Sequence, residues 1–228
     1  AAANHEEPDL FDAIAAEVAS RPLDEFKAQE LSITAWAFAT AGHAAPAMFE
    51  AIAAEAARRE LRDFNAQALS NMAWAFAVLD VAPEAPLFES SLFADRCTVM
   101  ADHFVGPFDA PLSQLHQWSL WREEQGAKWP PLPEALRTRC REAFVARNDR
   151  PPPKARPKSG MQGEVSDALR KLGGAKVRDE VICPASGYSI DAVVEIGDGR
   201  PVAVEVDGPA HFVGESHQPT GSTVIKRR

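Results

Sequence analysis

The apolar residues near the start of the chain recur at helical spacing. The adjacent residues Leu10 and Phe11 are followed by Ile14 and Val18 at steps of three or four positions. This spacing places them on one face of an amphipathic helix, which we expect to begin near Pro8 because proline suits a first helical turn. A second helix is predicted after Pro22. It carries Phe26 and Trp36 and ends near Gly42, since glycine is common directly after a helix.

This pair of helical patterns recurs 38 residues further along the chain. Segment 26–39 reads Phe-Lys-Ala-Gln-Glu-Leu-Ser-Ile-Thr-Ala-Trp-Ala-Phe-Ala, and segment 64–77 reads Phe-Asn-Ala-Gln-Ala-Leu-Ser-Asn-Met-Ala-Trp-Ala-Phe-Ala. The first helix recurs at the same offset through four identical residues: Pro8, Phe11, Ile14 and Glu17 match Pro46, Phe49, Ile52 and Glu55. A third, more divergent copy keeps the ten-residue step from Phe108 to Trp118. Agreement over two separate segments indicates a true structural repeat.

A helix pair of about 38 residues cannot bury its apolar face alone, whereas stacked pairs can. We therefore predict an α-solenoid of helix-hairpin repeats over residues 1–148, with one further amphipathic helix at about 134–147. The tryptophan and phenylalanine residues are expected in the core, because flanking alanines let neighbouring helices approach closely. Four polar positions face either solvent, as surface or capping residues, or a bound ligand: Gln29, Thr34, Gln67 and Asn71.

The pattern changes after the predicted helices. Residues 149–160 are basic and rich in proline, and polyproline II geometry makes such a stretch a semi-rigid linker. Beyond it, a short helix is predicted at 164–172, closed by Gly173-Gly174. Alternating or β-branched residues then predict three strands, at 176–182, 189–196 and 201–206. A turn at 197–199 joins the last two strands as a hairpin. Residues 161–228 are therefore predicted to form a second, small α/β domain.

Composition and charge narrow the possible functions. The net charge is −9, with 12 Lys+Arg against 23 Asp+Glu in residues 1–149 and 12 against 10 in residues 150–228. An acidic chain is poorly suited to non-specific capture of nucleic acid. No apolar run approaches the ~20 residues that span a bilayer, so no membrane partner is expected. The three separated cysteines, Cys97, Cys140 and Cys183, indicate reduced packing residues rather than disulfides or a zinc site.

Two motifs resemble known families. The repeat core, Phe-x-x-Gln-x-Leu-Ser-x-x-Ala-Trp-Ala-Phe-Ala, resembles the octotricopeptide repeats of algal and protist organellar proteins. It is also similar to the helical region of FAST-kinase-like mitochondrial RNA regulators. Segments 202–212, Val-Ala-Val-Glu-Val-Asp-Gly-Pro-Ala-His-Phe, and 221–228, Gly-Ser-Thr-Val-Ile-Lys-Arg-Arg, look like the RAP domain.

The resemblance to the RAP domain has two consequences for the predicted fold. RAP domains are thought similar in fold to restriction endonucleases of the PD-(D/E)XK type. The domain normally continues past its Lys-Arg, so residues 161–228 are expected to be its N-terminal portion, a truncated endonuclease-like fold. The chain, which begins with Ala1 rather than Met, is then expected to be part of a longer protein.

The acidic residues of the second motif allow three interpretations. A strand over 202–206 places Glu205 and Asp207 on one face, and Asp191 on the preceding strand can meet them across the hairpin. Converging carboxylates suit Mg²⁺, so these three residues are the catalytic and metal candidates if the chain is a nuclease. The endonuclease pattern has Lys where this chain has Asp207, which favours RNA recognition without cleavage. In the third interpretation the carboxylates brace a turn by accepting backbone N–H groups.

Direct contact with RNA is assigned to His211 and to nearby basic residues. The turn at Gly208-Pro209 presents His211 beside the acidic residues. Carboxylates repel phosphate, so RNA contact in this region needs cations. The candidates are Lys226, Arg227, Arg228, Lys158 and Arg156. A mobile basic tail without a ligand is the alternative.

The resemblance implies a function in post-transcriptional regulation. The chain is expected to bind single-stranded RNA, either organellar mRNA or rRNA, in a mitochondrion or plastid, alongside other RNA-processing proteins. It is expected to support RNA processing, maturation, stability or translation without being an enzyme and without a cofactor. Two alternatives stay open: a Mg²⁺-dependent endoribonuclease of PD-(D/E)XK type, and a helical scaffold for protein interaction.

Overall fold

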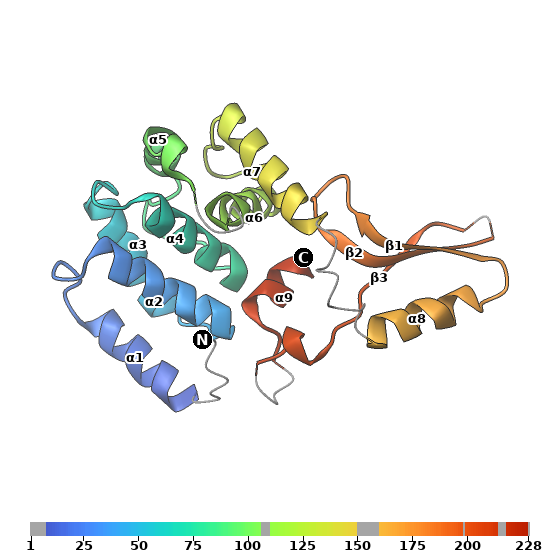
Figure 1. Cartoon of the computed structure of the whole chain (residues 1–228). Coiled ribbons are helices and arrows are strands. Elements are labelled where there is room, and N and C mark those ends of the chain that lie inside the picture. Colours follow the sequence, from blue (N-terminus) through green and yellow to red (C-terminus); the bar gives the residue numbers. More distant parts are fainter. Residues whose placement is uncertain (1–7, 106–109, 150–159, 198, 214–217, 228) are drawn as a thin grey trace. The chain divides into compact units, whose positions relative to one another are not determined.

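The computed structural model describes residues 8–105, 110–149, 160–197, 199–213 and 218–227 (Figure 1). A mostly helical region comes first and a small three-stranded antiparallel sheet follows. The helices of the first region are α1 (Pro8–Ser20), α2 (Ala28–Ala41), α3 (Pro46–Arg58), α4 (Ala66–Leu79), α5 (Leu92–Val99), the 3-10 turn η1 (Ala101–His103), α6 (Ala110–Glu124) and α7 (Glu134–Asn148). The predicted helices at the start of the chain and at 134–147 are therefore confirmed.

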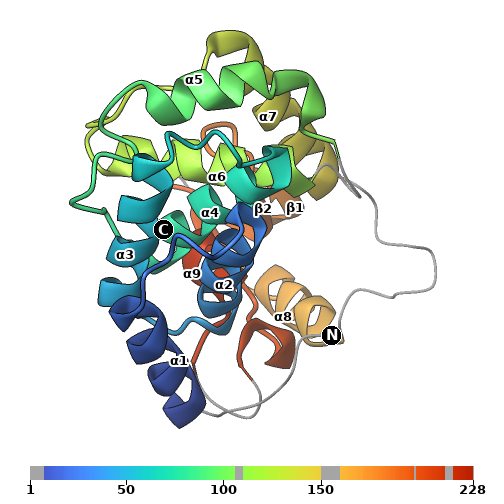
Figure 2. The ribbon, with the colours of Figure 1, turned by 90° about the vertical axis from the view of Figure 1, so that its left-hand side faces the viewer.

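The helices pack as successive pairs. The second helices of the pairs, α2, α4 and α6, lie side by side, and the first helix α1 packs on α3 (Figures 1 and 2). One aromatic contact joins the two helices within each pair. The ring centroids lie 4.9 Å apart in Phe11–Phe38, 5.0 Å apart in Phe49–Phe76 and 4.9 Å apart in Phe93–Trp118. Such edge-on and tilted aromatic pairs add to the free energy gained by burial.

The third pair differs from its sequence alignment. The alignment matched Trp118 with Trp36 and Trp74, through a segment that begins at Phe108. In the structure Trp118 makes the contact to the first helix that Phe38 and Phe76 make in the earlier pairs. Phe108 itself lies outside the described residues. The insertion before α6 thus changes which aromatic side chain fills the space between the two helices.

Local chemistry explains where the second helices of the first two pairs begin or end. The Asn65 side chain caps α4 by accepting a hydrogen bond from the Ala68 N–H at 2.8 Å. Gly42 ends α2 in the left-handed conformation with φ 66°, as predicted for a glycine at this position. Asp80 ends α4 with φ 57°, a conformation that aspartate adopts more readily than most residues. Each pair is therefore delimited by its own sequence.

A second group of elements forms the sheet. Helix α8 (Gly160–Arg170) precedes the strands β1 (Ala175–Ile182), β2 (Ser189–Ile196) and β3 (Val202–Val204), which pair in the order β1-β2-β3. The hairpin pairs Ala192 with Val204, as the sequence predicts for adjacent antiparallel strands. Strand β3 is shorter than the predicted 201–206. Helix α8 begins four residues before, and ends two residues before, the predicted 164–172.

Residue contacts divide the chain into two compact units. One comprises Ala1–Ala143 together with His211–Arg228, and the other comprises Phe144–Ala210. The 3-10 turn η3 (Pro209–His211) and helix α9 (Gly221–Lys226) lie near the C-terminal end of the sequence. Helix α9 packs on α2 and α4, and its Ile225 is buried in the helical core. The C-terminal part of the RAP-like segment therefore belongs with the helical unit, whereas the sequence placed it with the sheet.

Candidate nucleic-acid interface

The C-terminal motif residues contact one another. The Thr220 N–H donates to the His211 carbonyl at 2.9 Å, and the Thr223 hydroxyl lies 3.4 Å from His211 Nδ1. The Arg227 guanidinium carbon lies 5.8 Å from the centre of the Phe212 ring, a cation–π distance. The two halves of the motif, His-Phe and Gly-x-Thr, are therefore parts of a single folded element.

Gly221 allows this element to pack closely on the second helices. A Cβ built at Gly221 would lie 2.1 Å from the Ala39 carbonyl oxygen of α2 and 2.9 Å from a methyl group of Val78 in α4. No side chain fits at such distances, so only glycine permits this approach. Nearby, the Gln218 amide donates to the Gly42 carbonyl at 2.8 Å. The Gly-x-Thr motif is thus a docking feature for the layer formed by α2 and α4.

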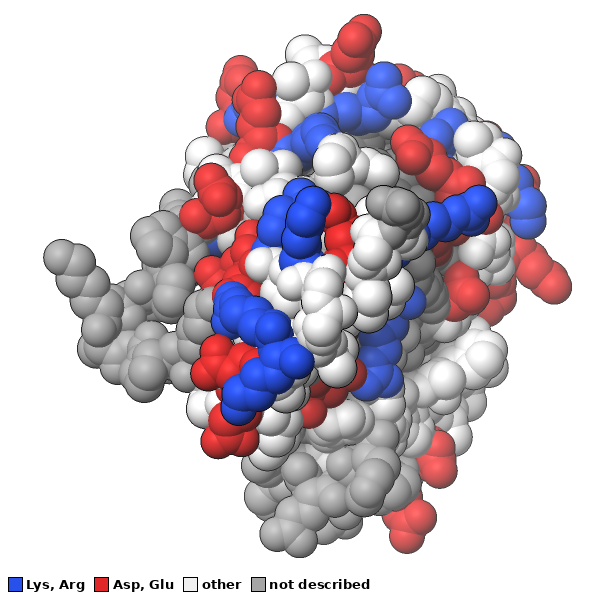
Figure 3. Space-filling view, turned by 90° about the vertical axis from the view of Figure 1, so that its right-hand side faces the viewer, with Lys and Arg blue, Asp and Glu red and all other residues white. Residues whose placement is uncertain are grey.

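The basic candidates are only partly within the described residues. Lys226 and Arg227 lie in and directly after α9, whereas Arg228, Lys158 and Arg156 lie outside the described residues. On the face shown in Figure 3, Lys and Arg side chains alternate with Asp and Glu among the residues described there. That face therefore carries a mixed charge, and any cationic contribution from the motif is local to α9.

Polar side chains on the second helices follow two different patterns. Gln29 and Gln67, one repeat apart, are both exposed at the start of α2 and α4. Asn71 is instead buried, and its Oδ1 accepts hydrogen bonds from Gln67 at 2.8 Å and from Gln114 of α6 at 3.1 Å. Thr34 donates to the Glu30 carbonyl of its own helix at 2.9 Å. Gln29 and Gln67 are thus exposed residues, although the Gln67 amide donates to Asn71, whereas Asn71 and Thr34 serve structural roles.

The tryptophans also differ in their exposure to solvent. The side chains of Trp74 and Trp118 are 8% and 1% exposed, which confirms the prediction that they pack in the core. The prediction is wrong for Trp36, which is 38% exposed. Trp36 lies on α2. Among the described residues, α4 has a second helix on each side, α2 and α6, whereas α2 has only α4 beside it. Together with the exposed Ile33, Trp36 gives α2 an apolar surface that α4 does not have.

The acidic candidates do not converge. Asp191 Oδ2 accepts a hydrogen bond from the Val206 N–H at 2.8 Å, and its Oδ1 lies 3.5 Å from the Gln162 amide of α8. Glu205 and Asp207 follow β3 rather than belonging to it, so strand alternation does not align them. Among the described residues, no group of three or more His, Cys, Asp or Glu side chains is placed to hold a metal ion. The hydrogen bond that Asp191 accepts from the Val206 N–H matches the bracing interpretation.

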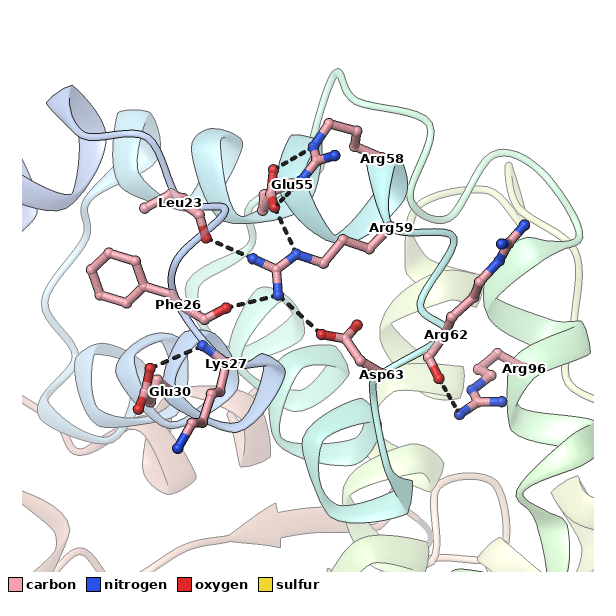
Figure 4. A network of polar contacts seen from close by, with 10 residues as sticks. All are labelled: Leu23, Phe26, Lys27, Glu30, Glu55, Arg58, Arg59, Arg62, Asp63 and Arg96. Atoms are coloured by element: carbon pink, nitrogen blue, oxygen red, sulfur yellow. Dashed lines mark hydrogen bonds and ion pairs between the residues drawn. The ribbon is translucent and has the colours of Figure 1, made fainter.

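Sequence inspection missed a set of arginines that link successive helix pairs (Figure 4). Arg59, at the end of α3, donates to the carbonyls of Leu23 and Phe26 at 2.6 and 2.7 Å. Arg96 of α5 donates to the carbonyls of Arg62 and Phe64 at 2.8 and 3.1 Å.

Arg139 of α7 continues the series by donating to the Ala101 carbonyl at 3.1 Å. Arg59 and Arg96 lie on, or directly after, the first helix of one pair, and their acceptors lie in the loop within the preceding pair. Arg139 lies on α7, and its acceptor lies in η1, between α5 and α6. The 38-residue step from Phe26 to Phe64 was the available signal for this linkage.

Glu55 holds the first of these arginines in place. Its carboxylate accepts hydrogen bonds from Arg58 and Arg59 at 2.6 Å each. The bond from Arg58, followed by that from Arg59, outweighs burial and lowers the pKa of Glu55 from 4.5 to about 2. The carboxylate therefore stays ionised over most of the acidic range and keeps the Arg59 guanidinium aligned with its carbonyl acceptors.

The buried cysteines have environments suited to packing. Burial raises the pKa of the Cys97 thiol well above its ordinary value, and burial raises that of Cys140 to about 12. Both thiols are therefore protonated at neutral pH, whereas nucleophilic and metal-binding cysteines react as thiolates. The structure thus agrees with the predicted packing role of these two residues.

Comparisons with known proteins provide no family assignment. No helix in the described part of the chain is long and apolar enough to cross a membrane. No protein-family model, curated protein or solved structure matches the chain.

Proposed function

We propose that this chain binds single-stranded RNA through its second helices and the C-terminal motif docked on them. In this proposal the helix pairs are octotricopeptide-like repeats of an α-solenoid, and residues 161–228 are the N-terminal portion of a RAP domain. The ligand is an organellar mRNA or rRNA, in a mitochondrion or plastid. Binding supports the processing, maturation, stability or translation of that transcript, in company with other RNA-processing proteins.

The docking of α9 on α2 and α4 is the observation that carries the proposal. Through Gly221 it brings Lys226 and Arg227 to the helices that carry the exposed residues Gln29 and Gln67. Phosphate contacts fix the position of a nucleic acid, whereas amide groups can pair with base edges. Trp36 adds an exposed aromatic face on α2, and a base can stack on such a face at a gain of about 1–3 kcal/mol.

Binding without cleavage is the form of this function that we favour. Asp191 accepts the Val206 N–H, so its carboxylate already serves a structural role at the end of the hairpin. Asp207 stands where the endonuclease pattern has a lysine that activates water. A Mg²⁺-dependent ribonuclease would cut labelled RNA in the presence of Mg²⁺ but not in EDTA, and the Glu205→Ala variant would not cut it. We expect the RNA to remain intact under both conditions.

The net charge of −9 favours a second candidate, a scaffold that binds protein rather than RNA. The two candidates differ in what ultraviolet light crosslinks to the chain in cells. Sequencing of the crosslinked RNA is expected to recover a few organellar transcripts. Mass spectrometry is expected to place the crosslinks in peptides of α2, α4 and α9. Recovery of protein partners without enriched RNA would support the scaffold and contradict our proposal.

A further inference from the structure

The internal repeat allows the face of one helix pair to be compared with the same face of the next. On α3, the side chains of Met48 and Ile52 are both 0% exposed, because α1 packs on this helix. Their counterparts on α1, one repeat earlier, are Leu10 and Ile14, which are 55% and 40% exposed. The first helix pair thus presents to solvent the apolar positions that the second pair buries completely.

A polar pair shows the same contrast. Glu55 and Arg59 lie 2.6 Å apart, and their side chains are only 10% and 13% exposed. Their counterparts, Glu17 and Arg21, lie 3.6 Å apart and are 64% and 50% exposed. Arg59 uses its remaining N–H groups to bind two carbonyls of the preceding loop. Arg21 pairs with Glu17 and lies over the Phe26 ring of its own pair, 5.7 Å from the ring centre.

These two comparisons specify the chemistry of a surface that would cover the exposed face of α1. This surface must cover two aliphatic side chains on α1 and must offer backbone carbonyls at the position of Arg21. In this structure α1 covers the apolar side chains of α3. The loop between α1 and α2 offers its Leu23 and Phe26 carbonyls to Arg59. A guanidinium that binds two carbonyls at once is selective in direction as well as distance. A helix pair of the same repeat therefore fits the open face, and a flat apolar surface does not.

The residues before Pro8 indicate how such a pair is connected. Ala1, Ala3 and His5 recur as Ala39, Ala41 and His43, at the same offset of 38. Asn4 stands at the position of Gly42, which ends α2 in the left-handed conformation, and asparagine is the usual substitute for glycine at such a position. The repeat pattern thus extends in front of Pro8 into residues that match the end of a second helix.

We propose that Leu10, Ile14, Glu17 and Arg21 form a docking face for one further helix pair of the same 38-residue repeat, joined directly in front of Pro8. The face consists of an apolar contact on α1 and an arginine clamp on the loop carbonyls of the added pair. The interaction is the one that joins α3 to the first pair, displaced by one repeat.

An extended protein with residues 8–45 duplicated in front of Pro8 tests this proposal. The matched control is the same extended protein with Leu10→Asp and Ile14→Asp in the copy adjoining α3. Hydrogen exchange is measured for the amides of that copy of α1, with the original chain as reference. The extended protein is expected to protect these amides about tenfold or more, and the control is expected to lose that protection. Equal exchange in the extended protein and the control would overturn the proposal.

The substitution Arg21→Ala supplies a second measurement on the same proteins. Among the described residues, the contacts of Arg21 are with Glu17 and Phe26 of its own pair, so in the original chain the midpoint of thermal unfolding is expected to change by less than about 2 °C. In the extended protein the same substitution is expected to lower the midpoint by roughly 5 °C. Equal shifts in the two proteins would exclude an arginine clamp. Sedimentation of the original chain adds a third outcome, because self-association abolished by Leu10→Asp would assign the face to a second copy and overturn the proposed occupant.

Discussion

Glu55 and Arg59 show how single residues make the helix pairs pH-sensitive. The folded-state pKa of Glu55 is about 2, below its ordinary value of 4.5. A lowered folded-state pKa contributes stability above pH 4.5, and this contribution is lost as the pH falls towards 2. We expect Glu55→Gln to lower the free energy of unfolding by about 2–3 kcal/mol at pH 7 and by much less near pH 3.

Urea denaturation of both proteins at pH 7, 5 and 3 measures this difference. Glu60→Gln is the matched control, because Glu60 pairs with Arg62 at an exposed site. Its effect is expected to stay within about 0.5 kcal/mol at each pH. A Glu55 effect of the same size at pH 7 and pH 3 would contradict the account of the ion pair.

The close packing at Gly221 leads to a second prediction at the residue scale. Gly221→Ala places a methyl group against the Ala39 carbonyl, so α9 must move away from α2. We expect a loss of about 2 kcal/mol or more in stability and faster proteolysis between His211 and α9. Gly163→Ala in α8 is the control, because nothing lies within 4 Å of a Cβ there, and it is expected to be neutral or slightly stabilising. Equal proteolysis of the two variants would show that α9 does not depend on this close approach.

The sequence predicted residue roles where periodicity alone decides them. Phe49, Phe76 and Trp74 are buried as expected, because they repeat at helical spacing among small residues. Trp36 has the same local sequence and is exposed, because burial depends on a neighbouring pair that no local pattern specifies. The sequence also could not predict that Asp191 binds the Val206 N–H, since this contact depends on the path of the backbone after β3.

At the scale of elements, the arginine clamps are the interaction that defines the order of the helix pairs. Arg59→Lys keeps the charge but replaces a planar group that binds two carbonyls by a single ammonium. We expect this substitution to lower stability by about 2 kcal/mol, because partly buried carbonyls lose their donors. Arg62→Lys, at an exposed position, is expected to change stability by less than about 0.5 kcal/mol. Thermal unfolding of both variants measures the difference, and equal effects would contradict the clamp.

Element boundaries followed from local chemistry more reliably than element contacts did. Strand β2 has the predicted bounds, since Gly187 and Gly197, both with positive φ, lie close to its two ends. Strand β3 ends at Val204, two residues early, because Val206 donates its N–H to the Asp191 side chain instead of continuing the ladder. The packing of α9 on α2 and α4 joins segments about 190 and about 150 residues apart in sequence. No local pattern contains that information.

At the scale of the whole molecule, the two compact units divide the RAP-like segment between them. The sheet unit holds Asp191 and Glu205, whereas the helical unit holds His211, Lys226 and Arg227. The basic part of the motif is thus built onto the helix pairs themselves. This arrangement predicts that the helix pairs and α9 bind one RNA segment together.

The most direct test is the affinity of the chain for a fluorescent single-stranded RNA identified by crosslinking, titrated between 50 and 200 mM salt. We predict a dissociation constant below about 1 µM at 100 mM salt. The double variant Lys226→Ala/Arg227→Ala should bind at least about tenfold more weakly, with a salt slope smaller by about 1.4 for the two lost phosphate contacts. The control, Arg62→Ala/Lys128→Ala, should bind like the original chain. No measurable binding, or equal weakening by both double variants, would contradict an RNA interface on the docked C-terminal motif.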